Sequence, residues 1–156
     1  MKTVYVETTV FSFYHDERPA SAYRCAVTRE WWRTQRQRYE LFTSRFAMEE
    51  VSNPVYPGWR KVAALARRVA QLELTDELEG IIKAYIDHRL MPLDDAGDAA
   101  HLAIASFHAV DYLLTWNCRH LANANKFEQI RTINRRLGLL TPELVTPEQL
   151  FAEAQG

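Results

Sequence analysis

Short runs of β-branched and aromatic residues alternate with longer segments of helical periodicity, and this alternation constrains the fold more than any other feature of the chain. Three runs, at residues 3–6, 39–42 and 110–115, predict buried strands, and Leu144 with Val145 predicts a short edge strand. Strands that alternate with helices indicate a parallel sheet. No linker, repeat or low-complexity segment divides the chain, so we expect one α/β domain over residues 1–156.

Helical periodicity predicts the elements between these strands. We expect helices at residues 20–38, 46–51, 59–69, 78–86, 98–106 and 126–137, and a last helix that begins at Thr146 and Pro147. Trp31 and Trp32 are adjacent and cannot share one helix face. One of these indoles is therefore expected in the core and the other at a rim or a partner surface.

Composition and charge favour a protein of the cytoplasm that does not enter a membrane. No window approaches the ~20 apolar residues of a membrane span, and the N-terminus lacks the features of a secretion signal. Two distant cysteines suggest neither a disulfide framework nor a zinc site. The net charge is −1, so attraction to a polyanion would have to come from local arginine clusters, at residues 29–38 and 131–136. For each cluster a solvated helix face is the favoured interpretation.

Four polar residues follow or adjoin the predicted strands in positions that can converge. Glu7 comes just after the first strand, Glu50 lies on the helix after the second, Asp98 begins an alanine-rich helix, and Asn117 follows the third strand. Strand ends and helix starts meet at one edge of an open parallel sheet. Glu50 is expected to point inward, whereas its neighbour Glu49 is expected to be an ordinary surface carboxylate.

Three carboxylates without a lysine in the same motifs would repel one another, and a divalent cation is the simplest remedy. Oxygen ligands select a hard metal, so Mg²⁺ or Mn²⁺ is favoured over zinc. Such a site can polarise a phosphodiester and lower the pKa of a bound water. A histidine general base, either His101 or His120, is a less favoured alternative. Cys118 beside His120 indicates an inert thiol rather than a catalytic pair.

The order and spacing of these motifs resemble the four acidic motifs of PIN-domain proteins. The segments that carry the resemblance are VETTVF, SRFAMEEV, DAAHLAIA and LLTWNCRHL, followed by the closing LVTPEQL. The resemblance spans nearly the whole chain. It implies a three-layer α/β/α sandwich with a central parallel sheet of four to five strands. It also implies an Mg²⁺- or Mn²⁺-dependent ribonuclease that cleaves RNA, because many family members are the toxin halves of toxin–antitoxin pairs.

Residue roles carried over from the family coincide with the residues found above. Glu7, Glu50 and Asp98 match the first three acidic positions and would be both catalytic residues and metal ligands. Thr8, Thr9 and Thr115 match hydroxyl positions that orient substrate or water near the metal. Asn117 stands where many members have a fourth acid, so a neutral amide oxygen would replace a carboxylate as ligand and catalytic group. This departure implies an altered or weakened metal site.

Several alternatives stay open at this point. The chain could be a PIN-like module that has lost catalysis and binds RNA or a protein, an interpretation that Asn117 favours. The same carboxylate chemistry could cut DNA instead of RNA. Among partners, the resemblance implies a small antitoxin protein. A homodimer is also expected, because four tryptophans are more than one small core readily hides and family members commonly pair.

Overall fold

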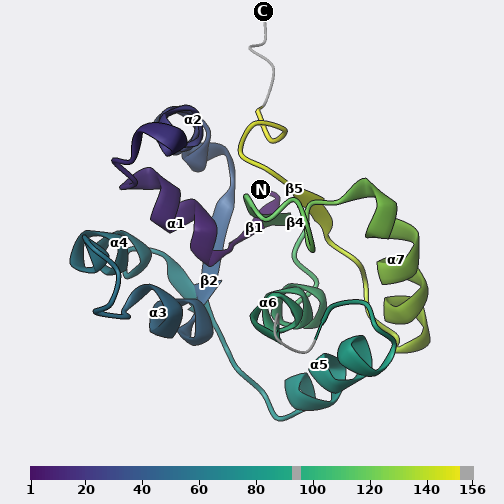
Figure 1. The fold of residues 1–156 in the computed structure, drawn as a ribbon. Helices are drawn as coiled ribbons and strands as arrows, with labels where there is room; N and C mark the ends of the chain where they lie inside the picture. Colours follow the sequence, from purple (N-terminus) through teal and green to yellow (C-terminus); the bar gives the residue numbers. More distant parts are fainter. Residues whose placement is uncertain (93–95, 152–156) are drawn as a thin grey trace, which may run out of the picture.

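The computed structural model describes residues 1–92 and 96–151. Its centre is one sheet of five parallel strands in the order β3-β2-β1-β4-β5 (Figure 1). The strands are β1 (Thr3–Val6), β2 (Glu40–Ser44), β3 (Ala70–Leu72), β4 (Tyr112–Leu114) and β5 (Glu143–Val145). In the registers on either side of β1, Val4 pairs with Leu41 and Tyr5 with Leu113.

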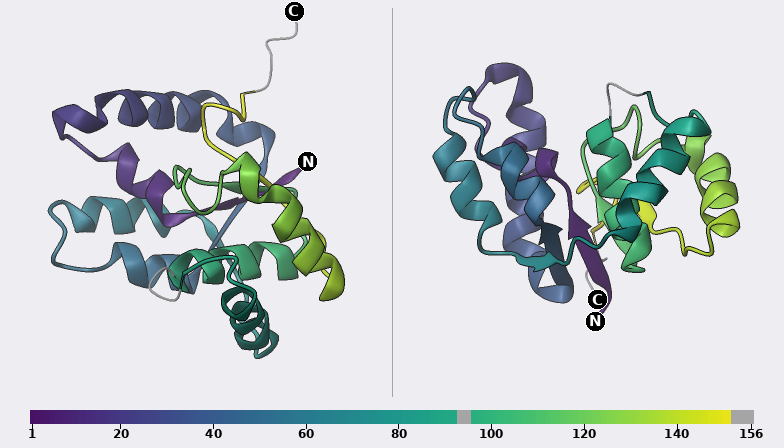
Figure 2. Two further views of the ribbon diagram at one scale, coloured as in Figure 1. Left: turned by 45° about the vertical axis from the view of Figure 1, so that its right-hand side comes forward. Right: turned by 90° about the horizontal axis from the view of Figure 1, so that it is seen from below.

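Helices cover both faces of this sheet and form three layers, as expected (Figure 2). One face carries α1 (Thr8–Tyr14), α2 (Ala22–Thr34), α3 (Arg45–Val51) and α4 (Trp59–Ala66). The other face carries α5 (Glu77–Asp87), α6 (Ala96–Phe107) and α7 (Phe127–Arg136). The described residues also form the 3₁₀ turns η1 (Pro19–Ser21), η2 (Arg36–Arg38) and η4 (Ala124–Lys126). The α/β/α sandwich with a five-stranded parallel sheet is thus confirmed.

Alternation along β1 divides the core into two parts. Val4 and Val6 point into a cluster with α1, α2 and α4, whereas Tyr5 points into a cluster with α5, α6 and α7. All three side chains are buried. A central strand of a parallel sheet is covered on both faces, which explains why Val4, Tyr5 and Val6 are all large apolar or aromatic residues instead of alternating with charged ones.

The chain order of the strands creates a switch point between β1 and β4. From β1 the chain moves to β2 and β3 on one side, and then crosses to β4 and β5 on the other. In open parallel sheets the crevice at the carboxyl ends of two such strands is the usual ligand-binding position. The residues that leave β1 and β4 at this crevice are Glu7 and Thr115, and the backbone N–H of Glu7 donates to Leu114 O at 3.0 Å.

Three local expectations were incomplete or wrong. Helix α1 and strand β3 were not predicted, because α1 is built from β-branched and aromatic residues and β3 has only three residues. The helix expected from Thr146 is wrong for the described residues, in which residues 147–149 form a turn. Backbone N–H groups of Gln149 and Leu150 both donate to Thr146 O in that turn.

The expectation for the adjacent tryptophans is confirmed in part: Trp31 and Trp32 are both buried, but Trp32 also lines two hollows of the surface. The C-terminal turn makes this possible, since the indole N–H of Trp31 donates to Leu150 O at 2.8 Å. Trp116 is buried too, and its indole N–H donates to Thr28 Oγ1 at 2.8 Å. A single core thus hides three of the four indoles.

Asp94 and Asp95, which precede the third acidic motif, lie outside the described residues. Within the described ranges, none of the helices has the length and apolar character needed to cross a membrane.

Candidate functional site

Glu7 is buried at the switch point and caps the start of α1. Its Oε2 accepts hydrogen bonds from the backbone N–H of Thr9 at 3.1 Å, from Thr9 Oγ1 at 2.5 Å and from Thr115 Oγ1 at 2.8 Å. Burial raises the pKa of Glu7, although the nearby His101 charge and these hydrogen bonds oppose the rise. Two of the three predicted hydroxyl residues therefore hold the first acid in place.

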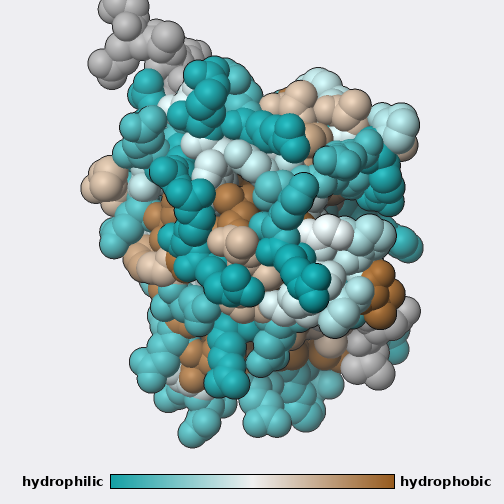
Figure 3. All heavy atoms as spheres, turned by 90° about the vertical axis from the view of Figure 1, so that its left-hand side faces the viewer, coloured by the Kyte–Doolittle hydropathy of each residue, from teal (hydrophilic) through white to brown (hydrophobic). Residues whose placement is uncertain are grey.

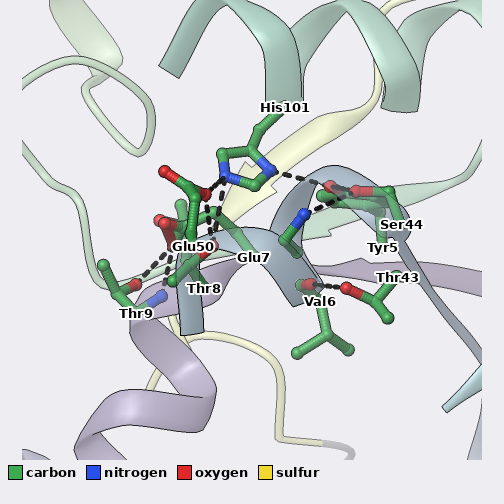
Figure 4. A network of polar contacts seen from close by, with 11 residues as sticks. Tyr5, Val6, Glu7, Thr8, Thr9, Thr43, Ser44, Glu50 and His101 are labelled. Atoms are coloured by element: carbon green, nitrogen blue, oxygen red, sulfur yellow. Dashed lines mark hydrogen bonds and ion pairs between the residues drawn. The ribbon is translucent and has the colours of Figure 1, made fainter. Parts of the chain in front are cut away.

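Glu50 faces the same region from the last turn of α3. Its Oε1 accepts from Thr8 Oγ1 at 2.6 Å and lies 2.5 Å from Nε2 of His101 on α6 (Figure 4). Glu49 instead points outward, with 67% of its side chain exposed and an ion pair to Arg45. The inward orientation predicted for Glu50 is confirmed.

His101 is the centre of the polar network. Its ring is fully buried, and Nδ1 lies 2.7 Å from the hydroxyl of Tyr5, which in turn lies 2.8 Å from Ser44 Oγ. Ser44 Oγ also caps α3 by accepting from the backbone N–H of Ala47 at 3.1 Å. The imidazole thus joins the ends of β1 and β2 to α3 and α6, as Figure 4 shows.

The charge state of His101 follows from its surroundings. Burial alone would lower the pKa of this imidazole, but the hydrogen bond to Glu50 and the negative charges of Glu7, Glu50 and Asp98 outweigh burial and raise it. For Glu50, partial burial acts to raise the pKa, but the hydrogen bond and charge of His101, with the Thr8 hydroxyl, lower it. Both shifts favour an imidazolium–carboxylate ion pair.

This ion pair adds a positive charge that the sequence argument for a metal did not include. The repulsion between the carboxylates was expected to require a divalent cation, but the chain supplies one positive charge itself, at His101. His101 was considered only as a general base, Ser44 only as a helix cap, and Tyr5 was not singled out. A histidine within the buried stretch 99–106 was the available signal, because a buried polar ring needs partners.

Asp98 lies in the first turn of α6, half-buried, where its charge acts on His101. The residues at this site match a divalent metal ion in their chemistry but not in their grouping. The carboxylate oxygens match the ligand preference of Mg²⁺ or Mn²⁺. In residues 1–92 and 96–151, however, no three His, Cys, Asp or Glu side chains are grouped so that they could hold one metal ion. As arranged here, Glu50 is engaged with His101 rather than grouped with Glu7 and Asp98.

Asn117 makes its side-chain contacts within the loop that follows β4. Its Oδ1 accepts from the backbone N–H groups of Arg119 at 3.2 Å and His120 at 3.0 Å. The backbone N–H of Asn117 donates to Thr115 Oγ1 at 2.9 Å, and the Thr115 hydroxyl in turn donates to Glu7. The amide oxygen therefore organises the loop after β4 and supports Glu7 through Thr115.

Gly97 lets α6 approach the site closely. A Cβ atom at this position would lie 3.2 Å from Glu50 Oε2 and 3.8 Å from Cζ of Phe46. The ring of Phe46 also packs edge-on against His101, with centroids 5.0 Å apart. The lack of a side chain at Gly97 thus leaves the room that the Glu50 carboxylate occupies.

Comparison with known proteins adds no assignment: no protein-family model matches the chain, and no curated protein matches it either. The resemblance to PIN-domain proteins therefore depends on the motifs quoted above, and it becomes part of a proposal.

Proposed function

We propose that the chain is a PIN-type endoribonuclease that uses Mg²⁺ or Mn²⁺ to hydrolyse RNA phosphodiesters. One observation carries the proposal: Glu7 and Glu50, 43 positions apart in the sequence, face the same buried His101 at the carboxyl edge of a parallel sheet. Ligand sites of parallel α/β folds occupy this position. The order of the acidic motifs is the further support.

In this proposal Glu7, Glu50 and Asp98 are the catalytic carboxylates and the metal ligands. A bound divalent cation would polarise the phosphodiester and lower the pKa of the attacking water. Thr8, Thr9 and Thr115 keep the two glutamates in position through their hydroxyls. Asn117 acts through the loop after β4 rather than as a ligand.

The second candidate is a PIN-like module that binds RNA or a protein and cleaves little or nothing. The Glu50–His101 ion pair favours it, because this pair neutralises a carboxylate that a metal would need. The absence of a three-ligand group among the described residues favours it as well.

Cleavage of RNA by the purified full chain distinguishes the two candidates. We expect a 5′-labelled single-stranded RNA to be cut with Mn²⁺ or Mg²⁺ and to stay intact with EDTA, and a single-stranded DNA of the same sequence shows whether DNA is also cut. Cleavage that persists in EDTA would refute the metal dependence. Intact RNA under every metal condition, together with RNA binding, would establish the second candidate.

The proposal extends to cellular role and partners. We propose that the protein acts in the cytoplasm as the toxin half of a toxin–antitoxin pair, with a small antitoxin protein as partner. Expression of the chain should arrest a bacterial host, whereas expression of Glu50→Gln should not. Equal growth of both strains, at equal protein levels, would refute the toxin role.

A further inference from the structure

A groove between α2 and α4 lies on the face of the molecule shown in Figure 3, where long hydrophilic side chains flank a strip of apolar atoms. It consists of two adjoining hollows of about 430 and 450 Å³, which share Trp32, Arg36, Gln37 and Arg68. We call it the α2–α4 groove. Its polar and aromatic walls include Tyr14, Arg29, Trp32, Arg33, Arg36 and Arg68.

The groove concentrates positive charge on a chain whose net charge is −1. Four arginines line it, against the single glutamate Glu30. Three of them, Arg29, Arg33 and Arg36, form one stripe of α2 and η2, and Arg68 comes from the end of α4. A solvated helix face does not account for Arg68, because this residue reaches the same hollow from a different element.

The four arginines differ in whether their guanidinium groups already contact other residues of the chain. Arg33 is paired with Glu30 at 2.8 Å, and Nε of Arg29 donates to Tyr14 O at 2.8 Å. Arg36 lies over the ring of Trp32, 5.6 Å from its centroid. Neither Arg36 nor Arg68 has a side-chain hydrogen bond or ion pair with another residue of the described chain. Their guanidinium N–H groups are thus available to an anion.

We propose that the α2–α4 groove binds the phosphate backbone of single-stranded RNA, with Arg36 and Arg68 as the main phosphate ligands. Guanidinium groups form paired hydrogen bonds with phosphate, and a positively charged groove with aromatic walls is typical of single-strand binding. Tyr14 and Tyr39, both half-buried, give the groove aromatic surfaces.

This inference rests on the proposed ribonuclease function, because it adds a binding path for the RNA to the candidate active site. Helix α1 connects the two: Glu7 caps its start and Tyr14 ends it at the groove wall. Seven residues of helix rise about 10 Å. The Tyr14 end of the groove therefore lies about that distance from Glu7 along the helix, whereas the other end of the groove is lined by Tyr39 and Ala70, near the starts of β2 and β3.

Fluorescence anisotropy with a labelled twelve-nucleotide uridine RNA tests the groove, in EDTA so that the proposed metal-dependent cleavage cannot occur. The variants are Arg36→Gln, Arg68→Gln and the double variant of the full chain. The matched control is Arg135→Gln with Arg136→Gln, two exposed arginines in the last turn of α7 on the opposite layer. Circular dichroism verifies that all variants are folded.

We expect the double variant to bind the RNA at least about tenfold more weakly than the wild type. The plot of log K against log[salt] should also become less steep, by about 1.4, which corresponds to the loss of two single-strand phosphate contacts. The control should stay within about twofold of the wild type. Absence of binding by the wild type, or an equal loss in the control, would overturn the inference. So would displacement of the RNA by polyglutamate at equal charge concentration, which would identify a site for an acidic protein segment.

A parallel Mn²⁺ cleavage assay separates failure of the groove from failure of the proposed function. Groove-dependent binding without cleavage leaves the groove supported and the ribonuclease refuted. Cleavage by the double variant at the wild-type rate, with wild-type binding, leaves the ribonuclease supported and the groove overturned.

Discussion

His101 is the residue on which the electrostatics of the candidate site depend. A raised histidine pKa contributes stability that is fully present below its ordinary value of 6.5 and is lost as pH rises through the folded-state pKa. The lowered pKa of Glu50 contributes stability that is present above 4.5 and is lost as pH falls through the folded-state pKa. The ion pair should therefore stabilise the metal-free protein most between these two values.

We expect His101→Gln to lower the free energy of unfolding at pH 6 by about 2 kcal/mol, less than for a fully buried pair, because 36% of the Glu50 side chain is exposed. The deficit should shrink at pH 9. Urea unfolding in EDTA from pH 4 to 9 measures both. Glu7, Asp98 and Tyr5 also face the His101 ring, and they are present in the wild type and in the variant. The difference between the two curves of unfolding free energy against pH therefore reports His101. A deficit that does not change with pH would show that His101 is neutral.

Asn117 gives a second prediction at the residue scale. Asn117→Ala removes two hydrogen bonds to the loop after β4 and should cost about 1–2 kcal/mol of stability. Asn117→Asp keeps the accepting oxygen and should be nearly as stable as the wild type, with Mn²⁺ affinity by calorimetry unchanged within about twofold. An Asp variant that binds Mn²⁺ at least tenfold more tightly would restore the ligand role that the family resemblance implied.

At the scale of elements, the approach of α6 to α3 at Gly97 sets the position of Glu50. Replacing a helical glycine by alanine usually stabilises a helix by about 1 kcal/mol. Gly80, in α5 with open space around its Cβ position, should show this gain as Gly80→Ala. Gly97→Ala should show none, because its methyl group would meet the Glu50 carboxylate at 3.2 Å.

Urea unfolding of the two glycine variants side by side measures this contrast. An equal gain in both would mean that the Glu50 carboxylate moves aside without cost, so that the ion pair with His101 is not fixed by the packing of α6.

The elements that the sequence predicts well are the apolar strand β1, the alanine-rich helix α6 and the helices with a clear apolar period, α5 and α7. Local propensity predicts the wrong element where tertiary contacts determine the secondary structure. The residues of α1 favour strands, but Glu7 caps them as a helix. Beyond Thr146, the turn that carries Leu150 onto Trp31 replaces a helix.

Sequence spacing could likewise place Glu7 and Glu50 at one edge, since parallel strands determine where their ends lie. It could not show that His101 lies between the acids. That placement depends on the rotation of α6 against α3, which the sequence pattern does not specify.

At the scale of the whole molecule, the buried indoles remove one argument for a dimer. Trp31, Trp32 and Trp116 are hidden within one chain, so the homodimer remains a proposal that rests on the family resemblance alone. Light scattering at micromolar concentration should give twice the chain mass of 18.1 kDa. A single species at the chain mass would refute the homodimer.

The central claim, that the inward carboxylates at the switch point perform RNA cleavage, is tested most directly by two adjacent glutamates. Glu50 contacts His101 and Thr8, whereas Glu49 is exposed on the same helix, so Glu50→Gln and Glu49→Gln change the charge equally in different places. With Mn²⁺ and a labelled RNA, the account predicts that Glu50→Gln lowers the cleavage rate at least about 100-fold and that Glu49→Gln changes it less than about twofold. Equal cleavage by both variants, at the rate of the wild type, would contradict it.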